Sequence, residues 1–172
     1  YAIESNDLDM LRFLSEEMGF ETEHAAHHVH ILAKENKAEA LEYLIARGVS
    51  VVSSESELEC NNPEVVTEGM SFQVTPIFHA IAEENKEVFD LLLESDPDLN
   101  HSISYARPAE FANFRKVTYS PLSFAVDSGA SEYFIKRLIG KGAQLIAENG
   151  DRESCFKRLV SNYGNAASDY LD

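Results

Sequence analysis

Cysteine, glycine and proline are all scarce in this sequence. Its only cysteines, Cys60 and Cys155, lie far apart and form no Cys-x-x-Cys pair, so neither a disulfide scaffold nor a cysteine-based zinc site is expected. Two reduced thiols are typical of an intracellular protein, cytoplasmic or nuclear. Gly and Pro number eight and five, too few for a fibrous or disordered chain. The length of 172 residues allows a single domain with a sizeable core.

Long apolar runs and basic residues are scarce as well. No apolar run approaches the roughly 18 residues of a membrane-spanning helix. Lys and Arg number 14 against 30 Asp and Glu, which gives a formal net charge of −16. Binding to nucleic acids or anionic membranes requires clustered Lys and Arg. We therefore predict neither nucleic acid nor membrane as a partner.

The negative charge is unevenly distributed. Residues 1–70 contain fifteen acidic and four basic side chains (−11), whereas residues 71–172 contain fifteen and ten (−5). Such a surface favours basic partners, mainly by steering their approach. The alternative is that the acidic residues only keep the protein soluble.

Sequence motifs for catalysis are also missing. The chain has no Gly-rich phosphate loop, no Gly-x-Ser-x-Gly and no His-Glu-x-x-His. Its carboxylates fall at positions expected to be exposed, whereas a catalytic carboxylate pair needs burial to separate its pKa values. We therefore predict that the chain is not an enzyme and binds no cofactor.

A histidine cluster is the one pattern that suggests a metal. On a continuous helix His24 and His28 would share a face, as two zinc ligands must. A helix that begins near His27 breaks this spacing, and further ligands are lacking. We predict instead that His30 bonds to the backbone, that the other histidines of the cluster are solvated, and that no metal is bound.

Residues 75–100 predict a helical hairpin that cannot bury its apolar face alone. Thr75 suits a helix cap, and Pro76 suits the first helical position. Ile77, Ala80 and Ile81 follow at helical spacing. Asn85 is expected to make a left-handed turn. A second apolar helix then follows, with inward-facing residues Val88, Phe89, Leu91, Leu92 and Leu93.

The same pattern recurs along the chain. Ser120, Pro121 and Leu122 repeat the start of the first helix, and Gly129 stands at the turn. Earlier, residues 27–33 occupy the first-helix position, and Asn36 supplies the turn. The second-helix apolar residues of this earlier unit are Ala40, Leu41, Tyr43, Leu44 and Ile45.

These units resemble the ankyrin repeat, whose consensus is roughly TPLHxAAxxGHxxVVxLLLxxGADxN. The match is carried by Thr75-Pro76-Ile77, Leu91-Leu92-Leu93 and Ser120-Pro121-Leu122, with Asp98, Asn100 and Gly142-Ala143. The resemblance implies an all-α solenoid of about four helix-turn-helix units, with the units headed by Leu32, Ala80 and Ala125 stacked in series. It also implies a monomeric protein-interaction module. The equivalent positions Ala2, Leu32, Ala80 and Ala125 are 30, 48 and 45 residues apart, against a family period near 33.

The extra length is assigned to inserts, so the expected single domain has seven segments. They are a partial repeat (1–23), a repeat (24–50), an acidic insert (51–72), a repeat (73–100), an aromatic and basic insert (101–119), a repeat (120–147) and a C-terminal cap (150–172). The inserts are expected as β-hairpin fingers or loops. Both forms stay open for 51–72. Because the chain begins in mid-repeat without Met, we interpret it as a piece of a larger protein.

The resemblance also predicts where a partner binds. Ankyrin stacks bind proteins across a concave face formed by the first helices and finger tips. The corresponding positions here form a mostly acidic strip, which favours a basic or mixed-charge protein segment. Aromatic residues beside Arg are frequent at interface hot spots, although the phenylalanines of the second insert can instead anchor it. The predicted contact residues are Glu4, Ser5, Lys34, Glu35, Glu83, Asp127 and Ser128, with Tyr105, Phe111 and Arg115 as finger anchors.

A second function belongs to a different class. Divergent, irregularly spaced units are similar to the ankyrin modules of effectors that intracellular bacteria deliver into host cells, often fused to enzymes. The alternative is therefore a scaffold or substrate-positioning domain of a larger enzyme whose catalytic part lies outside this chain, located in the host cell.

Overall fold

A computed structural model describes Asp9, Arg12 and residues 26–51, 56–57, 73–95, 99–100, 103–107, 115–145, 147–148 and 152–164. The chain divides into two compact units. The first comprises Tyr1–Ser56 and Val74–Pro97, and the second comprises Glu57–Gln73 and Asp98–Asp172. The described residues are mainly helical, as predicted.

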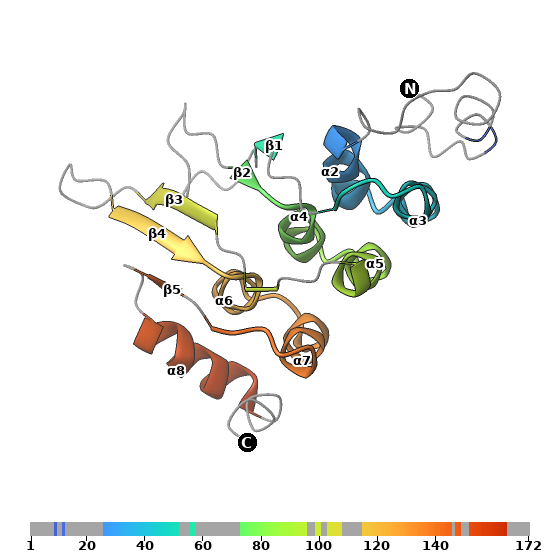
Figure 1. Cartoon of the computed structure of the whole chain (residues 1–172). Helices are drawn as coiled ribbons and strands as arrows, with labels where there is room; N and C mark the ends of the chain where they lie inside the picture. The colour runs from blue at the N-terminus through green and yellow to red at the C-terminus, as the bar shows by residue number, and fades with distance from the viewer. Residues whose placement is uncertain are drawn as a thin grey trace. The chain divides into compact units, whose positions relative to one another are not determined.

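The first unit contains two helical hairpins. Helix α2 (Ala26–Lys34) and α3 (Ala38–Ala46) form one, and α4 (Pro76–Ala82) and α5 (Lys86–Ser95) form the other. Helix α2 packs on α4, and α3 packs on α5 (Figure 1). The predicted stacking of the units headed by Leu32 and Ala80 is therefore present, and both residues are fully buried.

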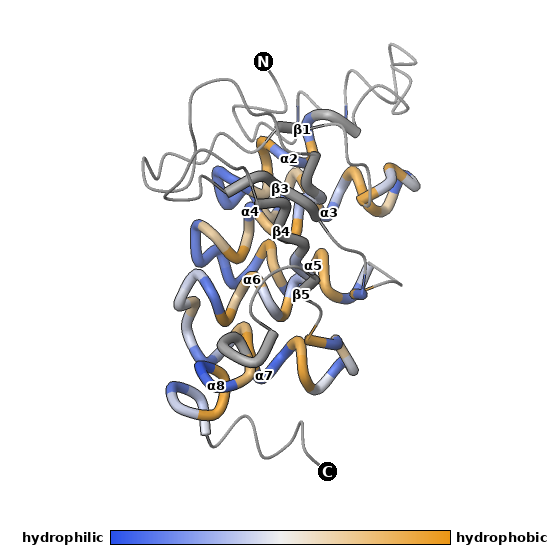
Figure 2. The backbone as a smooth tube through the Cα atoms, turned by 90° about the vertical axis from the view of Figure 1, so that its left-hand side faces the viewer, coloured by the Kyte–Doolittle hydropathy of each residue, from blue (hydrophilic) through white to orange (hydrophobic). Residues whose placement is uncertain are grey.

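The core of the first unit follows from amphipathic helices. Hydrophobic and hydrophilic residues alternate along each helix (Figure 2), because apolar residues at helical spacing form one face. Burying that face against a second hairpin removes it from water, which one hairpin alone cannot do. The largest fully buried side chains are Leu32, Leu41, Ile77, Phe78, Ile81, Phe89, Leu92 and Leu93.

The second unit combines a small sheet with three helices. Strands β3 (Ile103–Arg107) and β4 (Arg115–Tyr119) are antiparallel, with Ile103 opposite Tyr119, and β5 (Ala147–Glu148) pairs with the other edge of β4. Helices α6 (Pro121–Ser128) and α7 (Glu132–Gly140) form a third hairpin, and α8 (Arg152–Asn162) packs on α6. The second insert thus contains a β-hairpin, whereas strand β5 was not predicted.

One turn geometry recurs in all three described hairpins. Asn36, Glu84 and Gly129 have φ of 55°, 54° and 73°. The next amide in each turn donates to the carbonyl five residues earlier, on Leu32, Ala80 and Ala125, at 2.9, 2.9 and 3.0 Å. This bond and the left-handed residue before it are the features of a helix-ending Schellman turn. The three positions predicted to be equivalent are therefore equivalent in geometry.

Two local predictions were wrong in detail. The left-handed residue of the second hairpin is Glu84, not Asn85. Thr75 occupies the cap position of α4, but its side chain makes no capping hydrogen bond. Ser120 does cap α6 by accepting from the Ser123 amide at 3.3 Å, and both helices begin at the predicted prolines.

The remaining parts of the prediction are only partly described. Strand β1 (Ser56–Glu57) pairs with β2 (Gln73–Val74) at the two ends of the acidic insert. Asp9 and Arg12 are helical and exposed, and the rest of the partial first repeat lies outside the described residues. Helix α8 coincides with the predicted C-terminal cap, and its Leu159 is fully buried. A single continuous domain stays a prediction.

Candidate functional site

The two turns of the first unit carry three of the predicted contact residues, Lys34, Glu35 and Glu83. Helix α2 ends at Lys34, and α4 ends at Ala82. Lys34, Glu35, Ala82 and Glu83 are all exposed. They are exposed because each helix stops at the left-handed residue that follows, Asn36 or Glu84, so that the chain turns away from the core. We call these four residues the turn edge.

Asn85 ties the two halves of the turn edge together. Its side-chain Nδ2 donates to the backbone oxygens of Ala33 at 2.8 Å and Lys34 at 3.0 Å. Carbonyl groups at a helix C-terminus lack partners within the helix, and Asn85 supplies one across the hairpin stack. The turn after α4 is thereby fixed beside the end of α2, which brings Glu35 and Glu83 to one exposed edge.

A buried histidine pair lies on the same two helices. His30 on α2 and His79 on α4 are 2% and 5% exposed, and their rings meet edge to face with centroids 5.5 Å apart. Burial is the main cause, and the nearby His30 and Lys34 contribute less; together they lower the pKa of His79 from 6.5 to about 4. His79 is therefore neutral at physiological pH, and its Nε2 is buried without a hydrogen-bond partner.

Asp127 of the second unit does not form a free acidic surface. The Tyr119 hydroxyl donates to Asp127 Oδ2 at 2.6 Å, and the Arg158 guanidinium pairs with Oδ1. The Asp127 side chain is only 12% exposed. Its charge is thus engaged inside the unit, whereas the neighbouring Ser128 is exposed. The contact that we predicted for Asp127 with a partner would require these internal bonds to break.

The other predicted contact residues are not placed by the structure. Glu4, Ser5 and Phe111 lie outside the described residues. Tyr105 and Arg115 belong to β3 and β4, where Tyr105 stands opposite Val117 and Arg115 opposite Arg107. Their side chains lie outside the described part of the chain, so the finger anchors stay a prediction.

The histidine cluster of the sequence is only partly described. His30 is buried as an aromatic partner of His79, and His28, which was expected to be solvated, is half-buried. In the part of the chain that the structure describes, no three His, Cys, Asp or Glu side chains are placed to hold a metal ion. His24 is not among the described residues.

Sequence reasoning missed His79. Its position, two residues before the apolar Ile81 of a first helix, matched a variable position of the ankyrin pattern, so it was given no role. A signal was present, because His79 directly follows Ile77 and Phe78, which are both buried. A short helix with most of its turn buried leaves little exposed surface for a polar side chain, which made His79 a candidate for burial. Its burial depends on the partner hairpin, which the sequence of α4 does not contain.

Comparisons with known proteins add no assignment. No protein-family model matches the chain. No curated protein matches it either. Across the residues that the structure describes, none of the helices has the length and apolar character needed to cross a membrane.

Proposed function

We propose that the chain is a protein-interaction module of the ankyrin type, which binds a basic protein segment at the turn edge. The proposal rests on one observation. The two hydrogen bonds from Asn85 hold the exposed ends of α2 and α4 together, so that Glu35 and Glu83 can act on one ligand. The recurrence of one turn geometry in three hairpins supports the ankyrin type.

The charge of the first unit supports a basic ligand. This unit contains seventeen acidic and five basic side chains, which leaves −12 of the total of −16. The potential of such a surface raises the association rate of a cation and falls as salt is added. Because Lys34 is next to Glu35, the turn edge carries both positive and negative charge. This favours a ligand segment with an acidic residue among its basic ones.

The weakness of exposed ion pairs limits the affinity that the turn edge can provide by itself. An exposed ion pair contributes about 0.2–1 kcal/mol, so two carboxylates give selectivity and steering but not tight binding. The predicted finger anchors Tyr105, Phe111 and Arg115 are the residue types that would add affinity. No observation on the described residues favours the alternative role as a scaffold of a larger enzyme, and that alternative stays a prediction.

The test is charge reversal at the turn edge, with a matched control at two exposed acidic residues that are not part of it. The probe is a labelled, unstructured peptide of Lys, Arg, Gly and Ser. The variant Glu35→Lys/Glu83→Lys should bind it about tenfold more weakly than wild type at low salt, and the difference should shrink as salt rises. The control Asp9→Lys/Glu132→Lys changes the net charge equally and should leave most of the affinity intact.

Fluorescence anisotropy titration measures both affinities, and circular dichroism checks that the helices persist. An equal loss of affinity in both variants would show that only the net charge of the protein matters. That result would contradict specific binding at the turn edge. Asp127 is left unchanged in this test, because its reversal would break the contacts with Tyr119 and Arg158 and so report on folding.

A further inference from the structure

A hollow of about 370 Å³ lies between α3 and α5, on the second helices of the two stacked hairpins. We call it the α3–α5 groove. Its exposed interior is mostly apolar, and Ala38, Ile45 and Leu91 contribute to it. Its volume is within the roughly 300–1,000 Å³ that ligand pockets occupy. None of the turn-edge residues lines it.

Two large apolar side chains are left incompletely covered in this groove. Leu91 was expected to face inward, yet the structure leaves both Leu91 and Ile45 half-buried, whereas their neighbours Leu92 and Leu44 are 1% and 2% exposed. A half-buried Ile or Leu retains apolar surface that a ligand can still remove from water. The two residues come from different hairpins and meet at one hollow, so the exposed apolar surface is concentrated.

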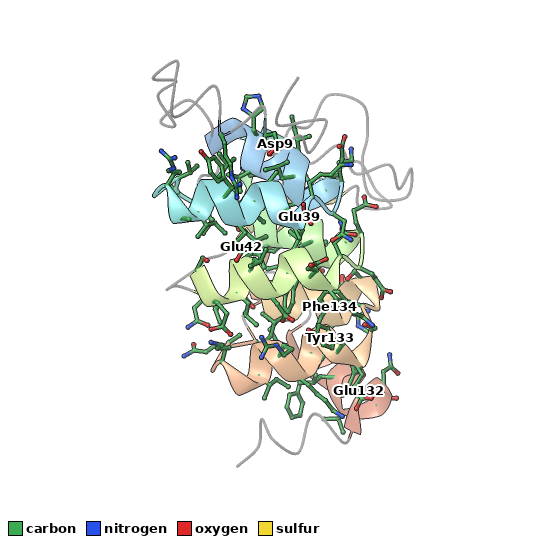
Figure 3. All side chains as sticks on the ribbon, turned by 90° about the vertical axis from the view of Figure 1, so that its right-hand side faces the viewer. Asp9, Glu39, Glu42, Glu132, Tyr133 and Phe134 are labelled. Atoms are coloured by element: carbon green, nitrogen blue, oxygen red, sulfur yellow. The ribbon has the colours of Figure 1, made fainter. Side chains whose placement is uncertain are left out.

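Carboxylates surround this apolar floor. Glu39 and Glu42 lie on the side of α3 that faces α5 (Figure 3). Glu87, Asp90 and Glu94 line the groove from α5, and the lining contains no Lys, Arg or His. The charged side chains that line the groove are therefore all of one sign.

The lining positions follow the helical repeat on both sides. Ala38, Glu42 and Ile45 are spaced i, i+4, i+7 on α3, as are Glu87, Leu91 and Glu94 on α5. Each stripe spans about 10 Å at 1.5 Å per residue. This length accommodates about two turns of a helix laid in the groove.

We propose that the α3–α5 groove docks an amphipathic helix of a partner protein, with apolar residues on the floor and Lys or Arg against the rim. The backbone groups of α3 and α5 bond within their own helices, so the groove offers no strand edge to an extended peptide. The ligand must therefore satisfy its own backbone, which a helix does. The five carboxylates of the groove favour a ligand helix with basic residues on both flanks.

Other occupants fit this groove less well. A second copy of the chain would bring a net charge of −16 against an acidic rim. A metal ion lacks a site, because no three carboxylate or imidazole side chains among the described residues converge on one point. The docking surface is also separate from the turn edge, so the two proposals stand or fall independently.

The experiment uses the 172-residue chain and three labelled peptides of equal length. The probe is a helical peptide with leucine at i, i+4 and i+7 and lysine on both flanks. The second peptide has glutamate in place of lysine. The third has the composition of the probe with its leucines moved off one face and a central proline, which breaks the helix.

Two matched double variants locate the binding surface. Glu42→Gln/Glu87→Gln removes two groove charges, and the control Asp9→Asn/Glu132→Gln removes two exposed charges that belong neither to the groove nor to the turn edge. The two change the net charge equally. We expect the groove variant to bind the probe about tenfold more weakly and the control variant to bind within about twofold of wild type. Amide chemical shifts of the wild-type chain should move at α3 and α5 on addition of the probe.

Several outcomes would overturn the proposal. The first is no binding of the probe, or binding of the glutamate peptide with equal affinity. The second is equal binding of the proline peptide, which would show that a helical ligand is not required. The third is an equal loss in both double variants, or chemical-shift changes confined to residues outside α3 and α5. Because the turn-edge test uses a peptide without apolar residues, its failure is distinguishable from the failure of this one.

Discussion

His79 shows how burial changes the chemistry of a single side chain. Its imidazole is almost fully covered, with one nitrogen unpartnered, and the charged groups that act on it are His30 and Lys34. Protonation would place a cation in a site that offers no anion to receive it. The folded state therefore favours the neutral ring, and the pKa drops to about 4.

The first prediction is a loss of stability as the pH falls. The unfolded chain protonates His79 near pH 6.5, whereas the folded chain does so near 4. Between these values the unfolded state binds one more proton, so the free energy of unfolding decreases as pH falls through this window and levels off below it. The total loss from this group is on the order of 3 kcal/mol.

The measurement compares urea unfolding of wild type and His79→Leu from pH 7.5 to 4. Carboxylates titrate in both proteins, so the difference between the two curves isolates His79. We expect the variant to become more stable relative to wild type as the pH is lowered. Parallel curves would show that His79 titrates normally and that its burial is without consequence.

Single residues also mark where sequence reasoning reached its limit. The left-handed turns at Asn36 and Gly129 were predictable, because Asn and Gly tolerate positive φ. In the second hairpin the turn falls on Glu84, which has no such preference, while Asn85 uses its side chain on a neighbouring helix. The local pattern contained two adjacent candidates, and a contact with α2, 51 residues away along the chain, determined their roles.

Asp127 joins three elements of the second unit. It lies on α6, accepts from Tyr119 at the end of β4 and pairs with Arg158 of α8. A little-exposed carboxylate is stable only with such partners. Tyr163, just after α8, adds a buried bond from its hydroxyl to the Ala130 oxygen at 2.7 Å. The terminal helix is therefore held by polar contacts at two places, one on α6 and one on the turn that follows it.

The second prediction concerns this Asp127 junction. Asp127→Ala removes both contacts and should lower the free energy of unfolding by about 2–3 kcal/mol, because hydrogen bonds to charged groups contribute more than neutral ones. Tyr119→Phe should cost about 1–2 kcal/mol. Arg158→Ala should cost less than about 1 kcal/mol, since the Arg158 side chain is 45% exposed.

Urea unfolding of these variants, with Ser161→Ala as an exposed control on α8, measures the three effects. The control should stay within about 0.5 kcal/mol of wild type. The double variant Asp127→Ala/Tyr119→Phe should cost less than the sum of its parts, because both substitutions remove the same bond. If the stability costs of the two single substitutions were strictly additive, the hydrogen bond between Tyr119 and Asp127 would be contradicted.

At the scale of elements, the helices were easier to predict than the surfaces they form together. Proline starts, apolar periodicity and turn residues fixed the hairpins in the sequence. The α3–α5 groove was not foreseen, because its floor comes from Ile45 and Leu91, which each look like core residues within their own helix. Only the packing of α3 on α5 leaves both half-covered. The spacing of Glu87, Asp90 and Glu94 on one side of Leu91 was the available signal.

Over the whole molecule, charge is concentrated where binding is proposed. The first unit carries a net −12 and the second −4. Like charges on one helix face destabilise the free protein by about 0.2–0.5 kcal/mol per pair. The groove has such pairs at Glu39 and Glu42, and again at Glu87 and Asp90. A protein selected for stability alone would space these charges differently, whereas a binding surface benefits from them.

The last prediction is therefore that the groove carboxylates cost stability in the absence of a ligand. Glu42→Gln should raise the free energy of unfolding by about 0.2–0.5 kcal/mol at low salt, because it removes repulsion with Glu39 within one helix face. The gain should disappear near 1 M salt, where the screening length is about 3 Å. Glu132→Gln is the sign control, since Glu132 pairs with Lys136 at 3.0 Å and its loss should lower stability by a few tenths of a kcal/mol. Urea titrations at both salt concentrations measure these effects. If Glu42→Gln gains no stability at low salt, the carboxylates of the groove do not repel one another, and the concentration of charge around the apolar floor has no energetic cost that ligand binding would relieve.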